Sequence, residues 1–211
     1  MNSFRRALVS AGLLAALAAG LPGATHAAAG AKRTVDVVKI MAFSCPVCRA
    51  AEAQDPVIER AVQATGGRFV HGPLPTSAAE SGAKERVYYA SRSTSPQFAS
   101  RVADSLYRGL QDLSIPLAEL PQVFVYFQQQ FPELTDQQLS QLFSAAQDKP
   151  AKQALSRAAG LAVAVGAASL PTYVIVVDGR PVAALDPESV GGGSLTVLRD
   201  EVIKRVQSYA K

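Results

Sequence analysis

The feature that most limits the fold of this 211-residue chain is a pair of cysteines at the point where an apolar strand meets a helix. Cys45 and Cys48 follow a β-branched apolar run over residues 34–43, which is typical of a strand buried on both faces. Pro46 suits the first turn of a helix, where no amide proton is required, and the sequence predicts that this helix continues to Val62. We therefore expect both cysteines at the N-terminus of that helix.

Three further strands are predicted, one before and two after a long stretch with almost no strand signal. Residues 68–71 read as a second strand that is parallel to the first, because the intervening helix supplies the crossover that parallel pairing requires. Residues 172–177 and 180–185 flank an Asp178-Gly179 pair, the sequence of a tight hairpin turn. Pro181 has no amide proton to donate, so the last strand is expected at the sheet edge. Helical spacing over residues 195–206 closes the chain.

The stretch between these pairs of strands, residues 76–169, has almost no strand signal and is predicted to be an all-helical insert of four or five helices. Phe98, Val102, Leu106 and Leu110 recur every four residues and give one apolar face. Thr135 with Gln138 forms a capping-box pattern at the start of another helix. The aromatic residues of the insert are expected in its core; they are Tyr88, Tyr89, Phe124, Tyr126 and Phe127.

The N-terminus has the pattern of a secretory signal peptide. Arg5 and Arg6 precede an apolar run over residues 7–21 and then small residues, and we expect cleavage after Ala27 to leave one domain, residues 28–211. The alternative is an uncleaved anchor, although this run is short for a span of about 20 residues. Without Arg5 and Arg6, 19 of the 21 basic residues remain against 17 acidic ones, a surplus too small to predict a nucleic-acid partner.

The chemistry of the cysteine pair follows from its spacing and its place. Zinc requires four ligands, and two thiols with His71 fall short, so we expect no metal and no other cofactor. A purely structural disulfide over so short a loop would stabilise the chain little. A redox pair is favoured, because backbone amides at a helix N-terminus stabilise a thiolate. Cys45 is then the nucleophile and Cys48, one turn deeper, the resolving partner.

Three parts of the chain give it a specific resemblance to a known family. Residues 43–48 (Phe-Ser-Cys-Pro-Val-Cys), the helical insert and residues 169–173 (Ser-Leu-Pro-Thr-Tyr) are similar to the DsbA family of periplasmic thiol-disulfide oxidoreductases. The resemblance implies a thioredoxin-like α/β fold of order β-α-β, helical insert, β-β-α, with a central mixed sheet. It also implies a cis bond before Pro171 beside the disulfide, so that the Leu170 backbone can pair with an unfolded substrate. Without the nearby cysteine pair, Pro171 would be interpreted as an ordinary trans proline at the start of a strand.

Three positions depart from the family pattern. Where the family has a Pro-His dipeptide between its cysteines, this chain has Pro46 and Val47, which predicts a less acidic Cys45 and a milder oxidant. Lys39 stands where such proteins commonly bury an acid, and it either pairs with Glu52 and helps to stabilise the thiolate or extends to the surface. The segment between the expected cleavage site and Thr34 is short and leaves little room for the first strand of the family. We therefore expect a sheet of four strands, or of five with a very short edge strand.

The functional hypothesis is a periplasmic dithiol oxidase that introduces disulfide bonds into exported proteins. Its substrates would be reduced or unfolded exported proteins, a DsbB-like membrane quinone reductase would reoxidise it, and it would act as a monomer. The alternatives are a disulfide reductase or isomerase, or a client-dedicated chaperone or assembly factor with little redox turnover. His71, at a predicted strand end, is expected to be a solvated loop residue rather than a proton shuttle.

Overall fold

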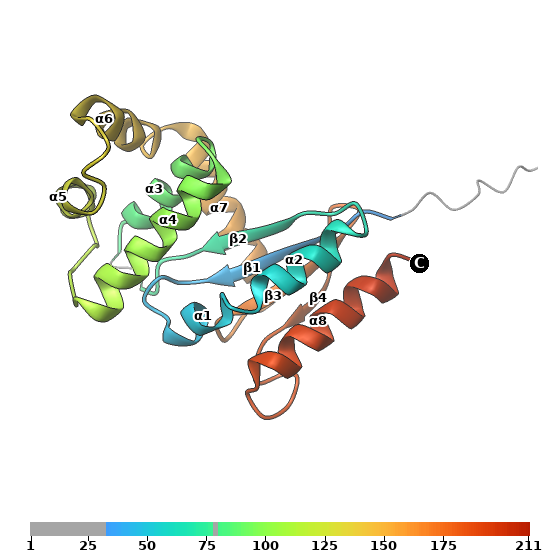
Figure 1. Ribbon diagram of the computed structural model, residues 1–211. Helices are drawn as coiled ribbons and strands as arrows, with labels where there is room; N and C mark the ends of the chain where they lie inside the picture. Colours follow the sequence, from blue (N-terminus) through green and yellow to red (C-terminus); the bar gives the residue numbers. More distant parts are fainter. Residues whose placement is uncertain (1–32, 78–79) are drawn as a thin grey trace, which may run out of the picture. The chain divides into compact units, whose positions relative to one another are not determined.

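The first apolar run forms the central strand of a four-stranded sheet in the computed structural model, which describes residues 33–77 and 80–211 (Figure 1). The strands are β1 (Val35–Met41), β2 (Phe69–Pro73), β3 (Thr172–Val177) and β4 (Arg180–Leu185), in the order β2-β1-β3-β4. β1 pairs parallel with β2 and antiparallel with β3. The sheet is therefore mixed. The sequence analysis allowed four or five strands, and the described residues form four.

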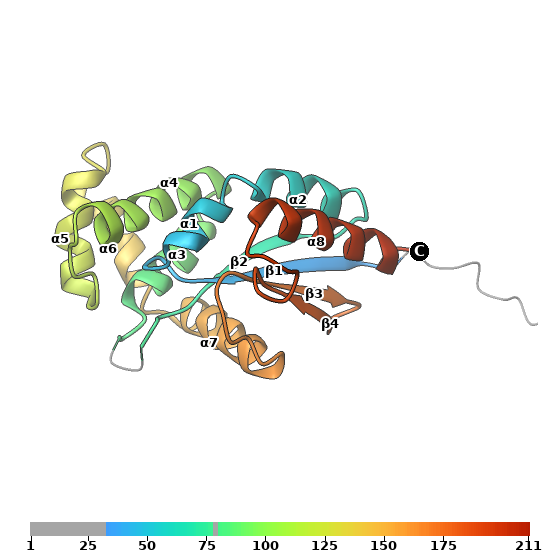
Figure 2. The ribbon, with the colours of Figure 1, turned by 90° about the horizontal axis from the view of Figure 1, so that it is seen from below.

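Helices lie on both faces of this sheet and beyond one end of it (Figures 1 and 2). They are α1 (Pro46–Ala51), α2 (Asp55–Gln63), α3 (Ala83–Arg92), α4 (Pro96–Tyr107), the π-helical turn η1 (Arg108–Asp112), α5 (Leu120–Gln130), α6 (Asp136–Ala145), α7 (Lys149–Ala164) and α8 (Leu195–Tyr209). α2 and α8 cover one face and α7 the other, whereas α3 to α6 form a helical lobe at the end of β1 and β2 that leads to the cysteines. This arrangement confirms the thioredoxin-like fold with a helical insert.

The helix that follows the cysteines is not continuous to Val62, as the sequence analysis expected. It ends at Ala51, and a new helix begins at Asp55. Pro56 explains the break, because it has no amide proton to donate to the carbonyl of Glu52 and its ring disfavours a helical neighbour before it. The chain crosses the gap with shorter-range bonds, from Gln54 N to Ala51 O and from Asp55 N to Glu52 O.

Glycine ends α2 at the point where the chain turns back into β2. Gly66 has a φ of +83°, a conformation that other residues rarely adopt. Gly67 lies so close to the backbone of Val35 that a side chain at this position would collide with its carbonyl group. The pair therefore both stops the helix and allows the chain to pass close beside the central strand.

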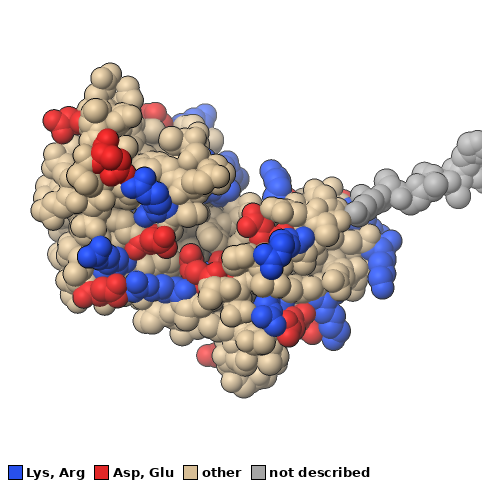
Figure 3. Space-filling view, in the orientation of Figure 1, with Lys and Arg blue, Asp and Glu red and all other residues tan. Residues whose placement is uncertain are grey.

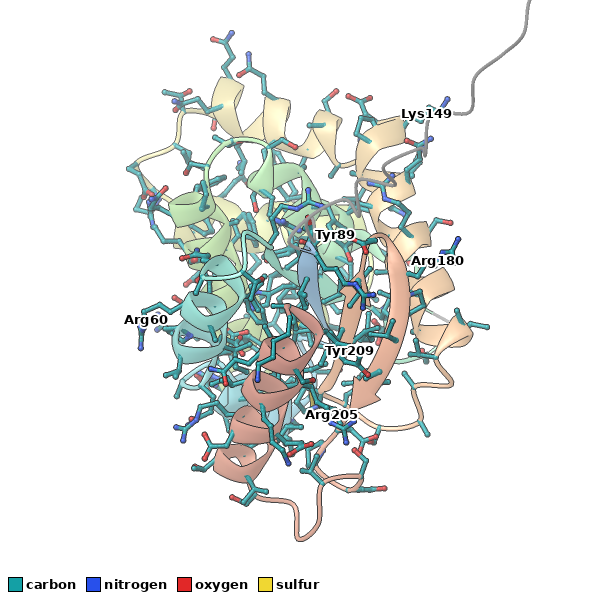
Figure 4. All side chains as sticks on the ribbon, turned by 90° about the vertical axis from the view of Figure 1, so that its right-hand side faces the viewer. Arg60, Tyr89, Lys149, Arg180, Arg205 and Tyr209 are labelled. Carbon is teal, nitrogen blue, oxygen red and sulfur yellow. A yellow bond between two sulfur atoms is a disulfide. The ribbon has the colours of Figure 1, made fainter. Side chains whose placement is uncertain are left out.

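The hairpin of β3 and β4 forms as the sequence predicts. Asp178 and Gly179 have φ values of +50° and +80°, which a type I′ turn requires. β4 is the sheet edge, and its pairing shifts by one residue where Val176 faces Pro181. Arg180, at the start of this edge strand, lies on the outside of the molecule, as does Arg205 of α8, whereas Tyr209 of α8 is partly buried (Figure 4).

Two apolar clusters hold the structure together. One joins the sheet to α2 and α8, through Val35, Val37, Ile58, Ile175 and Val202 among others. The second fills the helical lobe and includes the predicted aromatic residues Tyr88, Tyr89, Tyr126 and Phe127, with Phe124 partly buried against it. This second cluster also contains Cys48 and Phe43, so the core of the lobe extends to the redox pair.

The periodicity and capping patterns of the insert are also confirmed. Val102 and Leu106 are buried, and Phe98 and Leu110 pack partly buried against them. Thr135 and Gln138 form both bonds of a capping box at the start of α6. The predicted signal peptide and its cleavage after Ala27 lie outside the described residues. Among residues 33–77 and 80–211, no helix is both long enough and apolar enough to cross a membrane.

Charged side chains of both signs are interspersed on the face shown in Figure 3. Surface ion pairs link separate helices or neighbouring turns, such as Arg49 with Asp112 and Arg205 with Glu201. Exposed pairs of this kind stabilise a protein by no more than about 1 kcal/mol.

Candidate active site at the Cys45–Cys48 disulfide

Cys45 and Cys48 are joined by a disulfide where β1 passes into α1. Cys45 is the N-cap residue of α1 and is half-buried, whereas the side chain of Cys48 is fully buried. The Cys48 amide donates a hydrogen bond to Cys45 Sγ over 3.0 Å. This contact is of the kind that the sequence analysis expected, in which a backbone amide at the start of the 6-residue helix α1 faces the sulfur.

A segment from the far end of the chain completes the surroundings of Cys45. The peptide bond between Leu170 and Pro171 is cis, and the Leu170 carbonyl oxygen is 3.7 Å from Cys45 Sγ. Pro171 is buried and Leu170 is half-buried immediately before β3. The helical insert separates these residues from Cys45 in sequence, and the antiparallel pairing of β3 with β1 brings them back beside the pair.

The residue between Pro46 and Cys48 is on the surface. Val47 is 44% exposed, and Pro46 is also exposed. An isopropyl side chain carries neither charge nor hydrogen-bonding groups. Val47 therefore offers an apolar surface next to Cys45 and no electrostatic help to its sulfur.

Beneath the disulfide, Lys39 is fully buried rather than extended to the surface. Its ammonium group lies 2.6 Å from Asp55 Oδ2, 3.6 Å from Glu52 Oε1 and 3.3 Å from the carbonyl oxygen of Cys48. The expected partner Glu52 is present, but Asp55, which the sequence analysis did not single out, is closer. Asp55 is one turn beyond Glu52 and begins α2, so the break in the helix helps to bring both carboxylates to the same ammonium.

Two buried tyrosines orient these carboxylates. Tyr173 donates a hydrogen bond to Asp55 Oδ1 over 2.8 Å, and Tyr107 donates one to Glu52 Oε1 over 3.1 Å. Burial and the adjacent carboxylate raise the pKa of both tyrosines, so each remains a hydrogen-bond donor. For Asp55, burial raises the pKa, but the hydrogen bond from His71 and the charge of Lys39 outweigh that effect and hold it below its ordinary value.

No family model and no curated protein matches the sequence. The structure is similar to Pseudomonas aeruginosa DsbA, with a TM-score of 0.63 and 21% identity over 84% of this chain and 86% of that one. It is also similar to DsbA from Xylella fastidiosa, with a TM-score of 0.60 and 19% identity over 83% and 87% of the two chains.

This chain has the DsbA fold. A further DsbA structure, from Proteus mirabilis, holds a non-covalently bound peptide, PWATCDS; its TM-score is 0.58 and its identity 13%, over 81% of this chain and 88% of that one. These identities are low, so they support the fold, while the roles of individual residues are argued from the geometry of this chain.

His71 is not the solvated loop residue that the sequence analysis favoured. It lies within β2, directly opposite Lys39 on β1, and its Nε2 is 2.9 Å from Asp55 Oδ2. The Asp55 carboxylate can only accept, so Nε2 is the donor of this bond, and Nδ1 lies 3.3 Å from the Tyr88 hydroxyl. The parallel register of β1 and β2 decides this position, and the strand signal at residues 68–71 was its only sequence cue.

One group of the described residues has the donor atoms of a metal site. Glu52, Asp55 and His71 each offer a ligand atom, and these atoms lie within 4.8 Å of one another. The ammonium of Lys39 already lies against Asp55 and Glu52 and supplies positive charge there. The same three residues line a cleft of about 410 Å³, together with Tyr88 and Arg92.

The helical insert also reaches the active-site turn through η1. Gln111 Nε2 donates hydrogen bonds to the carbonyl oxygens of Phe43 and Cys45, over 2.8 and 3.2 Å. The next residue, Asp112, accepts two hydrogen bonds from the Arg49 guanidinium, over 2.6 and 3.0 Å. The sequence analysis missed both residues, because a glutamine and an aspartate on a helical surface carry no signal of a contact more than 60 positions away.

Proposed function

We propose that this protein is a thiol-disulfide oxidoreductase in which Cys45 is the nucleophile and Cys48 the resolving cysteine. The observation that carries the proposal is the asymmetry of the pair. Cys45 is partly exposed and its sulfur faces the Cys48 amide at 3.0 Å, whereas Cys48 is inaccessible. A sulfur that accepts a backbone hydrogen bond is stabilised as a thiolate, and a stabilised thiolate is a good leaving group.

The proposed reaction has two exchange steps. A substrate thiolate attacks Cys45 Sγ, forming a mixed disulfide as the Cys45–Cys48 bond breaks and Cys48 leaves as a thiolate that takes up a proton. A second substrate thiolate then attacks the substrate sulfur of the mixed disulfide and releases the Cys45 thiolate. The substrate loses two electrons and gains a disulfide, and the Cys45–Cys48 pair gains those electrons.

Leu170 is the proposed contact for the substrate backbone. Its carbonyl oxygen is 3.7 Å from Cys45 Sγ, so a peptide whose cysteine is joined to Cys45 would pass beside it. An extended peptide could hydrogen-bond to this backbone as a short added strand. The peptide held by Proteus mirabilis DsbA supports the proposal that a protein of this fold accepts an extended substrate.

The buried charges are proposed to tune the pair. Lys39 puts a positive charge 3.3 Å from the Cys48 carbonyl oxygen, and Glu52 and Asp55 partly neutralise it. In the reduced protein this ammonium would favour a sulfur anion and so replace part of the stabilisation that Val47 does not give. Pro46 would hold the first turn of α1 without needing an amide partner.

The direction of electron flow is proposed to be oxidation of exported proteins in the periplasm, after removal of a signal peptide ending at Ala27. A DsbB-like quinone reductase would restore the disulfide, and the protein would act as a monomer. The exposed Val47 supports one competing function, because a less stabilised Cys45 thiolate would move the protein toward a disulfide reductase.

Alkylation kinetics of the reduced protein test the assignment of the two cysteines. We expect one thiol to react with a pKa below the ordinary value of about 8.5. The fast reaction should disappear in Cys45→Ala and persist in Cys48→Ala. Equal reaction of both thiols, each ionising like free cysteine, would overturn the proposal.

Activity assays then separate the candidate functions. An oxidase should accelerate oxidative refolding of a reduced client in a glutathione buffer, and Cys48→Ala should accumulate a mixed disulfide with that client. A reductase should instead accelerate insulin reduction. A protein that only holds its client would show no turnover in either assay and would keep its client affinity in Cys45→Ala.

A further inference from the structure

The π-helical turn η1 and the residue before it bring side chains of the helical insert to the active-site turn. Tyr107, just before it, donates to Glu52, and within it Gln111 and Asp112 contact residues on either side of the disulfide. Three side chains from residues 107–112 thus contact the segment from Phe43 to Glu52. π-helical turns inside α-helices are frequent at functional sites.

The geometry of η1 depends on close packing against the neighbouring helix. Gly109 is buried, and a Cβ atom at this position would lie 2.9 Å from the Tyr126 ring and 3.0 Å from Leu117. The missing side chain lets η1 approach α5 closely, and Tyr126 is itself fixed by a hydrogen bond that it donates to the Ser105 carbonyl. The backbone that carries Gln111 is therefore held by the core of the lobe.

Gln111 uses both of its amide protons on the turn that carries Cys45. One acceptor is the carbonyl oxygen of the fully buried Phe43, 2.8 Å away. The other is the carbonyl oxygen of Cys45, 3.2 Å away, which also accepts the first hydrogen bond of α1 from Arg49 N. A buried carbonyl group that loses its donor costs free energy. Gln111 thus favours the conformation in which the Cys48 amide points at Cys45 Sγ.

We propose that Gln111 is a positioning residue for the redox pair, which holds the turn from Phe43 to Cys45 so that the Cys45 thiolate keeps its hydrogen bond from the Cys48 amide. The effect should be larger in the reduced protein. In the oxidised protein the covalent disulfide itself holds Cys45 against Cys48, whereas in the reduced protein only non-covalent contacts do. The inference rests on the proposed function, in which Cys45 reacts as a thiolate.

The test compares three variants with the wild type. Gln111→Leu removes both donors, and Gln111→Glu keeps the size of the side chain but replaces the donors with a negative charge. Gln128→Leu makes the same chemical change as the first variant on an exposed position of α5. For each, the Cys45 pKa is measured from thiolate absorbance, together with the equilibrium constant against glutathione and the unfolding free energy of both redox forms.

We expect Gln111→Leu to raise the Cys45 pKa by about 0.5 to 1 unit and to shift the glutathione equilibrium about threefold to tenfold toward the disulfide. Gln111→Glu should shift both quantities further in the same direction, and Gln128→Leu should shift neither. If Gln111→Leu does not fold, Gln111→Glu decides the question with the same measurements.

Two results would overturn the inference in different ways. If the wild-type Cys45 titrates as a depressed thiolate and the Gln111 variants leave its pKa and the equilibrium unchanged, while both redox forms are destabilised equally, Gln111 has a purely structural role. If the wild-type Cys45 titrates like free cysteine, the proposed function itself fails, whatever the variants show.

Discussion

The ammonium group of Lys39 lies 2.6 Å from the Asp55 carboxylate, although Lys39 is on the central strand and Asp55 begins the second helix. Both side chains are buried beneath the disulfide, and the Cys48 carbonyl oxygen is 3.3 Å from the same ammonium. A buried charge is tolerated when an opposite charge and hydrogen bonds compensate it. The stability of this region and the ionisation of its cysteines are therefore linked through one ion pair.

Replacing Lys39 with methionine should affect both stability and chemistry. Asp55 and Glu52 would lose their positive partner, and we expect the unfolding free energy to fall by about 3–5 kcal/mol. The Cys45 pKa should rise, because two carboxylates would remain near the pair without compensation. Urea unfolding and thiolate absorbance measure the two effects.

The double variant Lys39→Met with Asp55→Asn is the matched control for this prediction. It removes both charges of the pair, so it should recover part of the lost stability. Equal stability of the single and double variants would contradict the ion-pair argument, and an unchanged Cys45 pKa in the single variant would exclude a role of Lys39 in the chemistry.

The lowered pKa of Asp55 predicts how stability depends on pH. A carboxyl group whose folded pKa is depressed contributes stability above its unfolded pKa of about 4, and that contribution is lost as the pH falls through the folded pKa. We expect the unfolding free energy of the wild type to decrease below about pH 4. The Asp55→Asn variant should be less stable than the wild type at pH 7, and its unfolding free energy should decrease less on acidification. Parallel pH profiles of the two proteins would contradict this assignment.

Glu85 should behave in the opposite way. Its side chain is fully buried at the start of α3, and burial raises its pKa despite the Lys84 ammonium 3.3 Å from Oε1. A raised carboxyl pKa lowers stability as the pH rises above the unfolded pKa. Glu85→Gln should therefore stabilise the protein at pH 7, on the order of 1 kcal/mol.

This gain from Glu85→Gln should vanish below about pH 4, where the wild-type carboxyl group is protonated in both states. Lys84 keeps its ion pair with Glu80 in the variant, so its own charge stays compensated. Thermal unfolding at pH 3 and pH 7 measures the difference, and a Gln variant that is destabilised at pH 7 but not at pH 3 would show that the Lys84–Glu85 contact outweighs the cost of burial.

The surface position of Val47 allows a direct test of the dipeptide between the cysteines. A histidine there would project from the first turn of α1 beside Cys45 and, when protonated, would favour the thiolate. We expect Val47→His to lower the Cys45 pKa by about one unit and to shift the glutathione equilibrium about tenfold toward the reduced form. Val47→Leu, which stays apolar, should change neither, and an unchanged equilibrium in Val47→His would refute the prediction.

Local patterns in the sequence were sufficient for most of the secondary structure. Strand β1, the hairpin at Asp178 and Gly179 and the capping box at Thr135 depend on neighbouring residues, whose backbone preferences and periodicity are visible in the sequence. The position of Cys45 at the start of a helix was equally visible. The break at Pro56 could have been inferred, but the apolar periodicity on both sides of it suggested one helix.

The partners of the site were decided only by the tertiary structure. Sequence reasoning identified Lys39 and Glu52, misplaced His71 and missed Asp55 and Gln111. Strand register, the break between α1 and α2 and the docking of η1 determine which side chains meet. Contacts of this kind join positions far apart in the chain through packing, which leaves no local pattern. The sequence by itself thus determined the fold class and the redox pair, and the folded chain determined the charges and donors that surround that pair.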